Sequence, residues 1–420
     1  MKSKILLLLC LFCLHLAFSQ ESKQDYLSNN KFDLNKLAAF PQTEMKIIGF
    51  GAYHGSAKTE EAELLLLKSV LKNNTIRFYF PETDYSIAYF FNEYLQNGDE
   101  KLLKDLVETY GGRVPQERSV ETFMKWKNLK KINDDLASDK KIKVLGADPI
   151  VSYKYTCKHL LSLANSGIGS WKKLAVLKEM VEKDTANYSP YKENYAKKML
   201  REFVADYEAD QKSYEKFITD KNQFHHLIAT IKESFGESPR ETAIYNNYIA
   251  LSKIYNYDNE LKFFRYGFAH LMKIREDDNS PSFFTQLIEN KIYKKEEIVS
   301  ILGYLTKSRV LWDVIYDKKG NYKKSTTEGG FGIGDYKKEY FKGIDELKKQ
   351  KISDMTIFRL NQNGSPYEQI GTSDLMEVIL TPKPKELIDY SKKSTAGFID
   401  YAVLISNSKA NTSIYKLSEK

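Results

Sequence analysis

The feature that most constrains the fold is an alternation of short apolar runs with amphipathic helical patterns in the first third of the chain. The apolar run Met45–Phe50 is followed by a leucine-striped helical pattern over residues 60–71 and by a second run, Thr75–Phe80. After further helical patterns comes a third run, Lys141–Gly146. This alternation predicts a parallel sheet, in which the first two runs form a parallel pair with a right-handed crossover.

Polar residues follow these runs where each predicted strand ends. His54 follows the first strand and completes a Gly-x-x-His element that starts at Gly51, Glu82 follows the second strand, and Asp148 follows the third. The carboxyl ends of parallel strands share one edge of a sheet, and ligands bind at that edge. We therefore expect His54, Glu82 and Asp148 to lie together.

A second Gly-x-x-His element closes a later apolar run, Leu261–Tyr266, with Gly267 and His270. One such element arises easily by chance, whereas two in matching contexts indicate a site. The simpler alternatives stay open at this point: either histidine alone could be structural, and Glu82 and Asp148 could cap the helices that follow them.

Residues 153–258 are almost wholly helical in pattern and predict an insertion that covers the sheet edge. Its last helix begins near Arg240-Glu241 and carries Asn247. The adjacent His225 and His226 point about 100° apart on a helix, so surface or packing roles are expected for them.

The predicted fold class is α/β, with a mostly parallel sheet flanked by helices and a large helical insertion (cap) over the C-terminal edge of the sheet. The expected segments are a signal peptide (1–19), a first α/β segment with His54 and Glu82 (20–152), the helical insertion (153–258) and a second α/β segment with His270 (259–420).

The amino terminus has the composition of an export signal. Lys2 and Lys4 precede an apolar stretch over residues 5–18, and Ala17-Phe-Ser19 is a small-x-small cleavage site. We expect cleavage near Ser19-Gln20 and a periplasmic or secreted protein. No later run approaches the roughly 18 apolar residues that a membrane span needs.

The charge pattern bears on partners. The formal net charge is +8, but the lysines alternate with acids on helical faces. This pattern is typical of a solvated surface, so we expect a small-molecule substrate and no nucleic acid. The sequence does not define an oligomeric state.

The predicted cluster suits two kinds of chemistry. A neutral imidazole beside carboxylates can act as a general base on water, and a second imidazole can orient the water or bind an oxyanion. Alternatively, His54, Glu82 and His270 match a divalent metal site with water as the remaining ligand. The chain has no H-E-x-x-H or C-x-x-C motif to favour the metal, and no G-x-S-x-G motif of a serine hydrolase.

The order of these motifs resembles the erythromycin esterase-like family, within a wider group that includes TraB/Tiki proteases and ChaN-type haem-binding proteins. The resemblance spans most of residues 45–410. The matching motifs are Phe50-Gly-Ala-Tyr-His54-Gly55, Glu82, Gly146-Ala-Asp148, Arg240-Glu241 with Asn247, His270 and Phe398-Ile-Asp400.

The resemblance implies an exported hydrolase of ester or related bonds that requires no cofactor. It implies catalytic roles for His54, Glu82 and His270. Supporting or substrate-binding roles then fall to Asp148, Arg240, Glu241 and Asn247. The alternatives are a catalytically degraded protein of the same fold that binds a small molecule or haem, and a TraB/Tiki-like metalloprotease.

The chain departs from the family pattern at three positions. Gly51 replaces the glutamate three residues before the first histidine, Gly267 replaces a histidine, and Glu63 replaces an arginine. We therefore expect His54 to lack its supporting carboxylate, which would weaken general-base catalysis and disfavour macrolide esterase activity.

Overall fold

The computed structural model describes residues 22–37, 40, 44–277, 281–318, 322–328, 334–382 and 388–419. The predicted signal peptide and its cleavage site lie outside these residues. No helix in the described ranges is long and apolar enough to cross a membrane.

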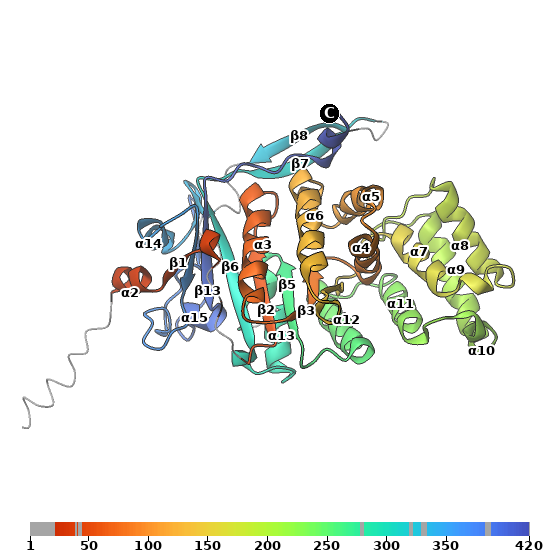
Figure 1. Ribbon diagram of the computed structural model, residues 1–420, viewed down its shortest axis with the longest axis horizontal. Coiled ribbons are helices and arrows are strands. Elements are labelled where there is room, and N and C mark those ends of the chain that lie inside the picture. The colour runs from red at the N-terminus through yellow and green to blue at the C-terminus, as the bar shows by residue number, and fades with distance from the viewer. Residues whose placement is uncertain are drawn as a thin grey trace, which may run out of the picture.

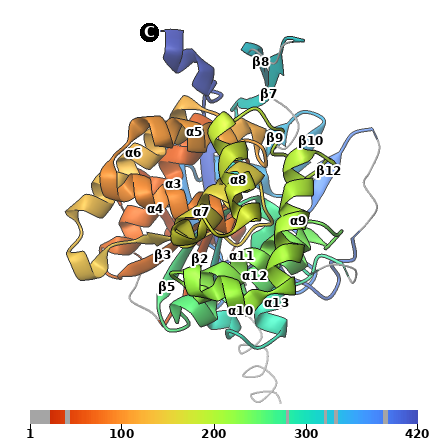
Figure 2. The ribbon, with the colours of Figure 1, turned by 90° about the vertical axis from the view of Figure 1, so that its right-hand side faces the viewer.

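An eight-stranded sheet forms the centre of the molecule, with helices on both faces (Figures 1 and 2). Six adjacent strands run parallel, and two further strands extend one end through antiparallel pairings. The predicted α/β class is confirmed. In spatial order the strands are β1 (Lys31–Asp33), β11 (Met355–Arg359), β13 (Tyr401–Ser406), β6 (Ile298–Thr306), β2 (Ile47–Ala52), β5 (Leu261–Tyr266), β3 (Ile76–Pro81) and β4 (Lys143–Val144).

The pairing of β2 with β3 corrects the prediction from the sequence. The two strands are parallel members of one sheet, but they are not neighbours, because β5 lies between them and pairs with both. All six residues of β5 are buried. A strand hydrophobic on both faces is most stable in the interior of a sheet, and the insertion allows β5 to return there.

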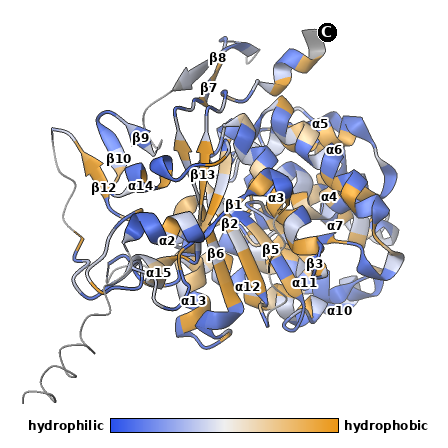
Figure 3. Ribbon diagram, turned by 60° about the vertical axis from the view of Figure 1, so that its left-hand side comes forward, coloured by the Kyte–Doolittle hydropathy of each residue, from blue (hydrophilic) through white to orange (hydrophobic). Residues whose placement is uncertain are grey.

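Alternate side chains of the strands pack into two hydrophobic cores, one on each face of the sheet. Ile48, Phe50 and Phe263 point to one face, whereas Phe80 and Phe264 point to the other. Figure 3 shows the strands as largely hydrophobic beside helices of mixed hydropathy. The first face is covered by α3 (Ala57–Leu71), α4 (Tyr85–Asn97), α5 (Glu100–Tyr110) and α6 (Val120–Asp135).

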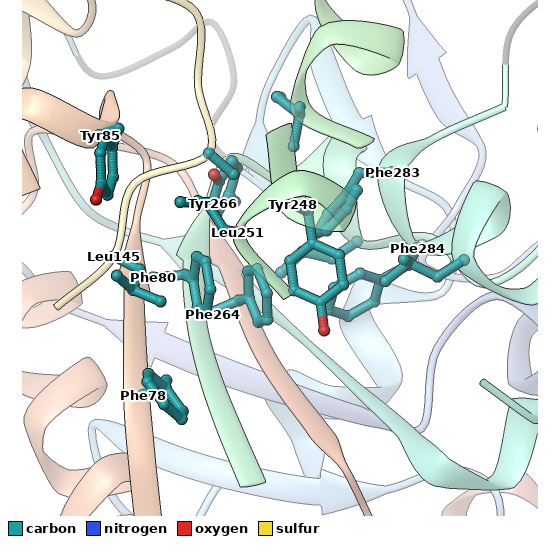
Figure 4. Packing of buried hydrophobic residues seen from close by; sticks show 14 of the residues in the cluster. Phe78, Phe80, Tyr85, Leu145, Tyr248, Leu251, Phe264, Tyr266, Phe283 and Phe284 are labelled. Carbon is teal, nitrogen blue, oxygen red and sulfur yellow. The ribbon is translucent and has the colours of Figure 1, made fainter. Parts of the chain in front are cut away.

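The second face contains an aromatic cluster beneath the carboxyl ends of β3 and β5. Phe80 stacks on Phe264 with ring centroids 4.5 Å apart, and Tyr248 and Phe283 pack against Phe264 (Figure 4). These contacts fix α12 (Arg240–Tyr255) and α13 (Phe283–Glu289) against the sheet.

The helical insertion lies beyond the β3–β4 end of the sheet (Figure 1). Tyr85, which follows β3, contacts His159 and His226 of the insertion, so the insertion packs beside the carboxyl end of that strand. Its helices before α12 are α7 (Tyr153–Leu163), α8 (Lys172–Lys183), α9 (Tyr195–Ala209), α10 (Gln211–Tyr214) and α11 (Lys221–Glu233).

The remaining elements lie outside the central sheet or at its β1 end. One of them, the strand β7, pairs with β8 in a hairpin separate from the central sheet. These elements are α2 (Lys23–Asn29), β7 (Val310–Tyr316), β8 (Tyr322–Glu328), β9 (Asp335–Tyr336), β10 (Glu339–Phe341), α14 (Ile344–Lys349), β12 (Val378–Leu380) and α15 (Thr395–Phe398).

Candidate active site

His54 lies in the tight loop between β2 and α3. Gly55 makes this loop possible, because its φ is +88° and an added Cβ would lie 2.6 Å from the carbonyl oxygen of Leu311. The imidazole contacts a carboxylate on each side: Nδ1 lies 2.6 Å from Glu117 Oε1, and Nε2 lies 3.1 Å from Glu82 Oε2. The side chain is 14% exposed, so the ring is held firmly and is still reachable from solvent.

Glu82 lies at the centre of the site, at the end of β3. Its Oε2 accepts a hydrogen bond of 2.7 Å from the backbone N–H of Gly267, and its Oε1 accepts one of 2.6 Å from Arg240 Nη2. His270 Nε2 is 3.8 Å from Oε1. One carboxylate thus connects the ends of β3 and β5 with the first turn of α12.

Glu82 does not cap the helix that follows it, α4, although the sequence allowed this role. The cap of α4 is Asp84, whose Oδ1 accepts a hydrogen bond from the backbone N–H of Ile87.

Arg240 and Asp148 form a bidentate pair beside Glu82. The Nε and Nη2 atoms of Arg240 donate to the two carboxylate oxygens of Asp148, both at 2.8 Å. The third nitrogen, Nη1, lies 3.2 Å from His270 Nε2. Since a guanidinium only donates, Nε2 of His270 is the acceptor in this contact.

Glu241 supports His270 from the opposite side of the ring. Its Oε1 is 2.5 Å from His270 Nδ1, and its Oε2 accepts a hydrogen bond of 2.7 Å from the backbone N–H of Phe283. The structure thus brings six of the seven residues predicted for the site into one contact network: His54, Glu82, Asp148, Arg240, Glu241 and His270.

Asn247 is the predicted residue outside this network. Its side chain is buried and donates to the backbone carbonyl of Ala147, with Nδ2 3.1 Å from the oxygen. It contacts the site only through this backbone position, next to Asp148.

The prediction that His54 lacks a carboxylate partner is wrong. A side chain at Gly51 would collide with Leu302, because an added Cβ would lie 2.8 Å from Leu302 Cδ2. The supporting acid is Glu117, from the 3-10 turn Pro115–Glu117 before α6. This turn has no strand-end pattern, and its sequence signal is an acid two residues before the helix cap Ser119.

A buried charge cluster lies behind His54. Lys125 Nζ is 2.7 Å from Glu60 Oε2 and 3.0 Å from Glu63 Oε2, and Arg265 Nε is 3.5 Å from Glu63 Oε2. Arg265 also places Nη2 3.4 Å from His54 Nδ1. Where the resemblance predicts an arginine on α3, this chain has Glu63, and β5 supplies the guanidinium instead.

Gly267 leaves space beside the central carboxylate. A Cβ added there would lie 3.6 Å from Glu82 Oε2 and 3.4 Å from His270 Cδ2, which are ordinary contact distances. A side chain at this position would therefore enter the site, and the glycine leaves that volume free.

The charges around the two histidines set the direction of their pKa shifts. Burial and Arg265 act to lower the pKa of His54, but the contacts with Glu117 and Glu82 outweigh them, and the net shift is upward. Burial likewise acts to lower the pKa of His270, and Glu241 and Glu82 raise it above its ordinary value. The histidines and Arg240 in turn hold the pKa of Glu82 well below its usual range, against the effect of burial.

The described histidines and carboxylates of the site do not form a donor set for a metal ion. Among the described residues, no group of three or more His, Cys, Asp or Glu side chains is arranged to hold one. Glu82 already accepts from Arg240, and the guanidinium of Arg265 lies on the far side of His54.

Comparisons with known proteins extend the description of the fold. No family model and no curated protein matches the chain. Among solved structures, an erythromycin esterase variant in its open conformation aligns over 88% of this chain and 93% of its own, with a TM-score of 0.53 and 10% identity. The chain shares the fold of an erythromycin esterase.

Two further structures align over nearly the whole chain. A protein from Bacillus cereus covers 93% of this chain and 98% of its own, with a TM-score of 0.58 and 12% identity. A succinoglycan biosynthesis protein covers 94% and 98%, with a TM-score of 0.59 and 14% identity. At these identities the likeness to all three structures concerns the fold.

Proposed function

We propose that the protein is an exported hydrolase of ester or related bonds, in which His54 activates water without a metal ion. The observation that carries the proposal is the arrangement of His54, with Glu117 Oε1 2.6 Å from Nδ1 and Nε2 directed to the Glu82 centre. A base whose second nitrogen is held by a buried carboxylate has the geometry that general-base catalysis uses.

The proposed reaction begins with His54 in its neutral form. Water then lies between Nε2 and Glu82, in place of their direct contact. Nε2 takes a proton from the water as its oxygen attacks the carbonyl carbon, and Arg240 Nη1 donates to the oxyanion that develops. The carbon–oxygen ester bond breaks, and the proton passes from Nε2 to the leaving alkoxide, giving an acid and an alcohol.

The charges of the site support a reaction without a metal ion. Arg240 lies 2.6 Å from Glu82, where a divalent cation bound to that carboxylate would have to displace it. Arg265 adds a second positive charge near His54. Both guanidinium groups oppose cation binding between the two histidines.

Hydrolysis of a panel of p-nitrophenyl esters by the mature protein tests the proposal. We expect His54→Ala to reduce turnover by about 1,000-fold, the range that general-base catalysis supplies. The matched control is His225→Ala, which removes a half-exposed imidazole far along the chain and leaves turnover unchanged. Circular dichroism checks that both variants are folded.

Unchanged turnover in His54→Ala would contradict the proposal. An absorption spectrum and elemental analysis test its alternatives in the same preparation. A Soret band would identify a haem-binding protein. Stoichiometric metal that is lost in the His54→Ala/His270→Ala variant, or chelator-sensitive peptide cleavage, would identify a metal-dependent hydrolase.

A further inference from the structure

A polar cavity lies at the opposite edge of the sheet from His54. It has a volume of about 420 Å³ and is lined by the amino ends of β6 and β13, at Ile298 and Tyr401, and by Arg359 at the end of β11. The six residues of β2 separate the two edges by about 20 Å, at 3.3 Å per residue. The cavity is therefore independent of the proposed hydrolase site.

A buried ion pair anchors one wall of this cavity. Lys273 Nζ donates to both carboxylate oxygens of Asp400 at 2.9 Å and to the backbone carbonyl of Ile298, also at 2.9 Å. Asp400 also accepts from the backbone N–H of Ser300 at 2.8 Å and from Asn361 Nδ2 at 2.6 Å. Both charges are thus satisfied and serve as a fixed support.

This support orients the guanidinium of Arg359. Asn361, which Asp400 holds through its amide nitrogen, accepts a hydrogen bond of 3.3 Å from Arg359 Nε through its amide oxygen. The two terminal nitrogens of Arg359 contact no acceptor in the described part of the chain. They form the fork that a planar carboxylate fits with two parallel hydrogen bonds.

Lys295 supplies a second cation in the same cavity. Its ammonium group has no carboxylate within 4.0 Å among the described residues, although the side chain is partly buried. Burial and the charge of Lys273 lower the pKa of Lys295, and they outweigh the opposite effect of Asp400 and Glu296. A bound anion would supply the charge that this lysine lacks.

The rest of the lining sets the character of the ligand. One side of the cavity is apolar and consists of Phe40, Met45, Ile298 and Tyr401. The rings of Phe40 and Tyr401 meet edge to face, with centroids 5.5 Å apart. The acids Glu296 and Glu368 are exposed. An apolar side opposite two cations favours a ligand with an apolar body and one anionic group.

We propose that this cavity binds a small organic carboxylate, with its carboxylate between Arg359 and Lys295 and its apolar body against Phe40 and Tyr401. The site has no part in the proposed hydrolysis, so either proposal can fail without the other.

Isothermal titration calorimetry with 3-phenylpropionate tests this site. We expect saturable binding to the wild type and a Kd at least ten times weaker in Lys295→Gln and in Arg359→Gln. Lys253→Gln removes the same charge from an exposed position on α12 and should bind as the wild type does. Because Lys295 forms no ion pair within the described ranges, its variant should unfold at an unchanged temperature.

Other ligands and one further variant locate the site. The uncharged amide 3-phenylpropanamide should not bind measurably, and inorganic phosphate should bind at least ten times more weakly than the carboxylate. His54→Ala should leave the Kd unchanged. The proposal is overturned by absence of saturable binding to the wild type, or by Kd values in Lys295→Gln and Arg359→Gln that equal that of the wild type. It is also overturned if the amide or phosphate binds as tightly as the carboxylate, or if His54→Ala loses binding.

Discussion

Two pairs of histidines in this protein are largely shielded from solvent and have opposite surroundings. His54 and His270, at the candidate active site, have side chains 14% and 12% exposed. His159 and His226, in the helical insertion, are 0% and 6% exposed. All four lie near the carboxyl end of β3 or the helix that follows it, since the second pair packs against Tyr85.

The first pair lies among carboxylates and guanidinium groups, and the second among aromatic rings. His159 stacks on Tyr89 with centroids 3.9 Å apart, and neither of its ring nitrogens has a hydrogen-bond partner in the described structure. Nε2 of His226 likewise has none there. Burial lowers the pKa of His159 to about 3 and that of His226 to about 4.

The comparison separates burial from function. Burial acts to lower the pKa of every one of these histidines, and only the carboxylates at the site reverse the shift. A buried histidine with carboxylate partners is therefore a candidate base. A buried histidine surrounded by aromatic rings is a packing residue.

Glu82→Gln should have the largest effect on the difference in pKa between the two pairs of histidines. The amide keeps the shape but removes the charge that raises the pKa of both His54 and His270. We expect both pKa values to fall and esterase turnover to drop by about 1,000-fold or more. The reason is that His54, His270 and Arg240 all lose the carboxylate that they share. NMR titration of the imidazole Cε1 protons measures the pKa values.

Glu93→Gln is the matched control for that experiment, because Glu93 is exposed on α4. It should leave both titrations and turnover unchanged. Histidine pKa values that stay the same in Glu82→Gln would show that the central carboxylate does not set them.

A smaller effect is expected from Glu117→Gln, because Glu117 contacts His54 but not His270. The pKa of His54 should fall, so the acid limb of the pH–rate profile should move to lower pH, while the maximal rate falls by about 100-fold. In the wild type this limb should lie above pH 6.5, the ordinary value for histidine, because neutral His54 is the active form. Glu61→Gln, on the exposed face of α3, is the control. An acid limb at the same pH in Glu117→Gln would exclude the proposed support of His54.

The smallest effect should come from His159→Phe in the insertion. Phenylalanine fits an aromatic environment and removes two buried nitrogens that lack partners, so we expect a gain in the free energy of unfolding of about 1 kcal/mol at pH 7. Thermal and urea unfolding measure this gain. A loss of stability would show that His159 has a partner in solution.

The pH dependence of the same variant tests the pKa of His159. Between pH 6.5 and the folded-state pKa values of about 3 and 4, the unfolded chain binds more protons at His159 and His226 than the folded chain does. The free energy of unfolding is therefore not reduced by these two histidines above pH 6.5. Below that pH it falls as the pH decreases, by at most about 1.4 kcal/mol per pH unit for each histidine. His159→Phe should reduce this slope between pH 6.5 and 5.

The sequence predicted much of the site because strand ends carry local patterns. Apolar runs followed by His54, Glu82, Asp148 and His270 were visible, and β5 was predicted with the bounds that the structure has. Parallel strands place such residues at one edge whatever their order, so the grouping did not depend on the pairing of strands.

The residues that were missed depend on contacts that no local pattern encodes. Glu117 comes from a short 3-10 turn, and Arg265 lies within a strand whose hydrophobic pattern hides its role. The order of β2, β5 and β3 follows from long-range packing, as does the separate β7–β8 hairpin. The expectation for His225 and His226 was confirmed, since one hydrogen-bonds Tyr207 at the surface and the other packs against Tyr85.

Because β5 lies between β2 and β3 in the sheet, the site can form only after β5 has been synthesised. Ala52 at the end of β2 and Arg265 on β5 are in contact, yet 213 residues separate them in the chain. During synthesis, β2, β3 and the whole insertion are complete before β5 emerges, and the two halves of the site cannot meet until then. A nascent chain shorter than about 270 residues therefore contains His54 and Glu82 but not His270.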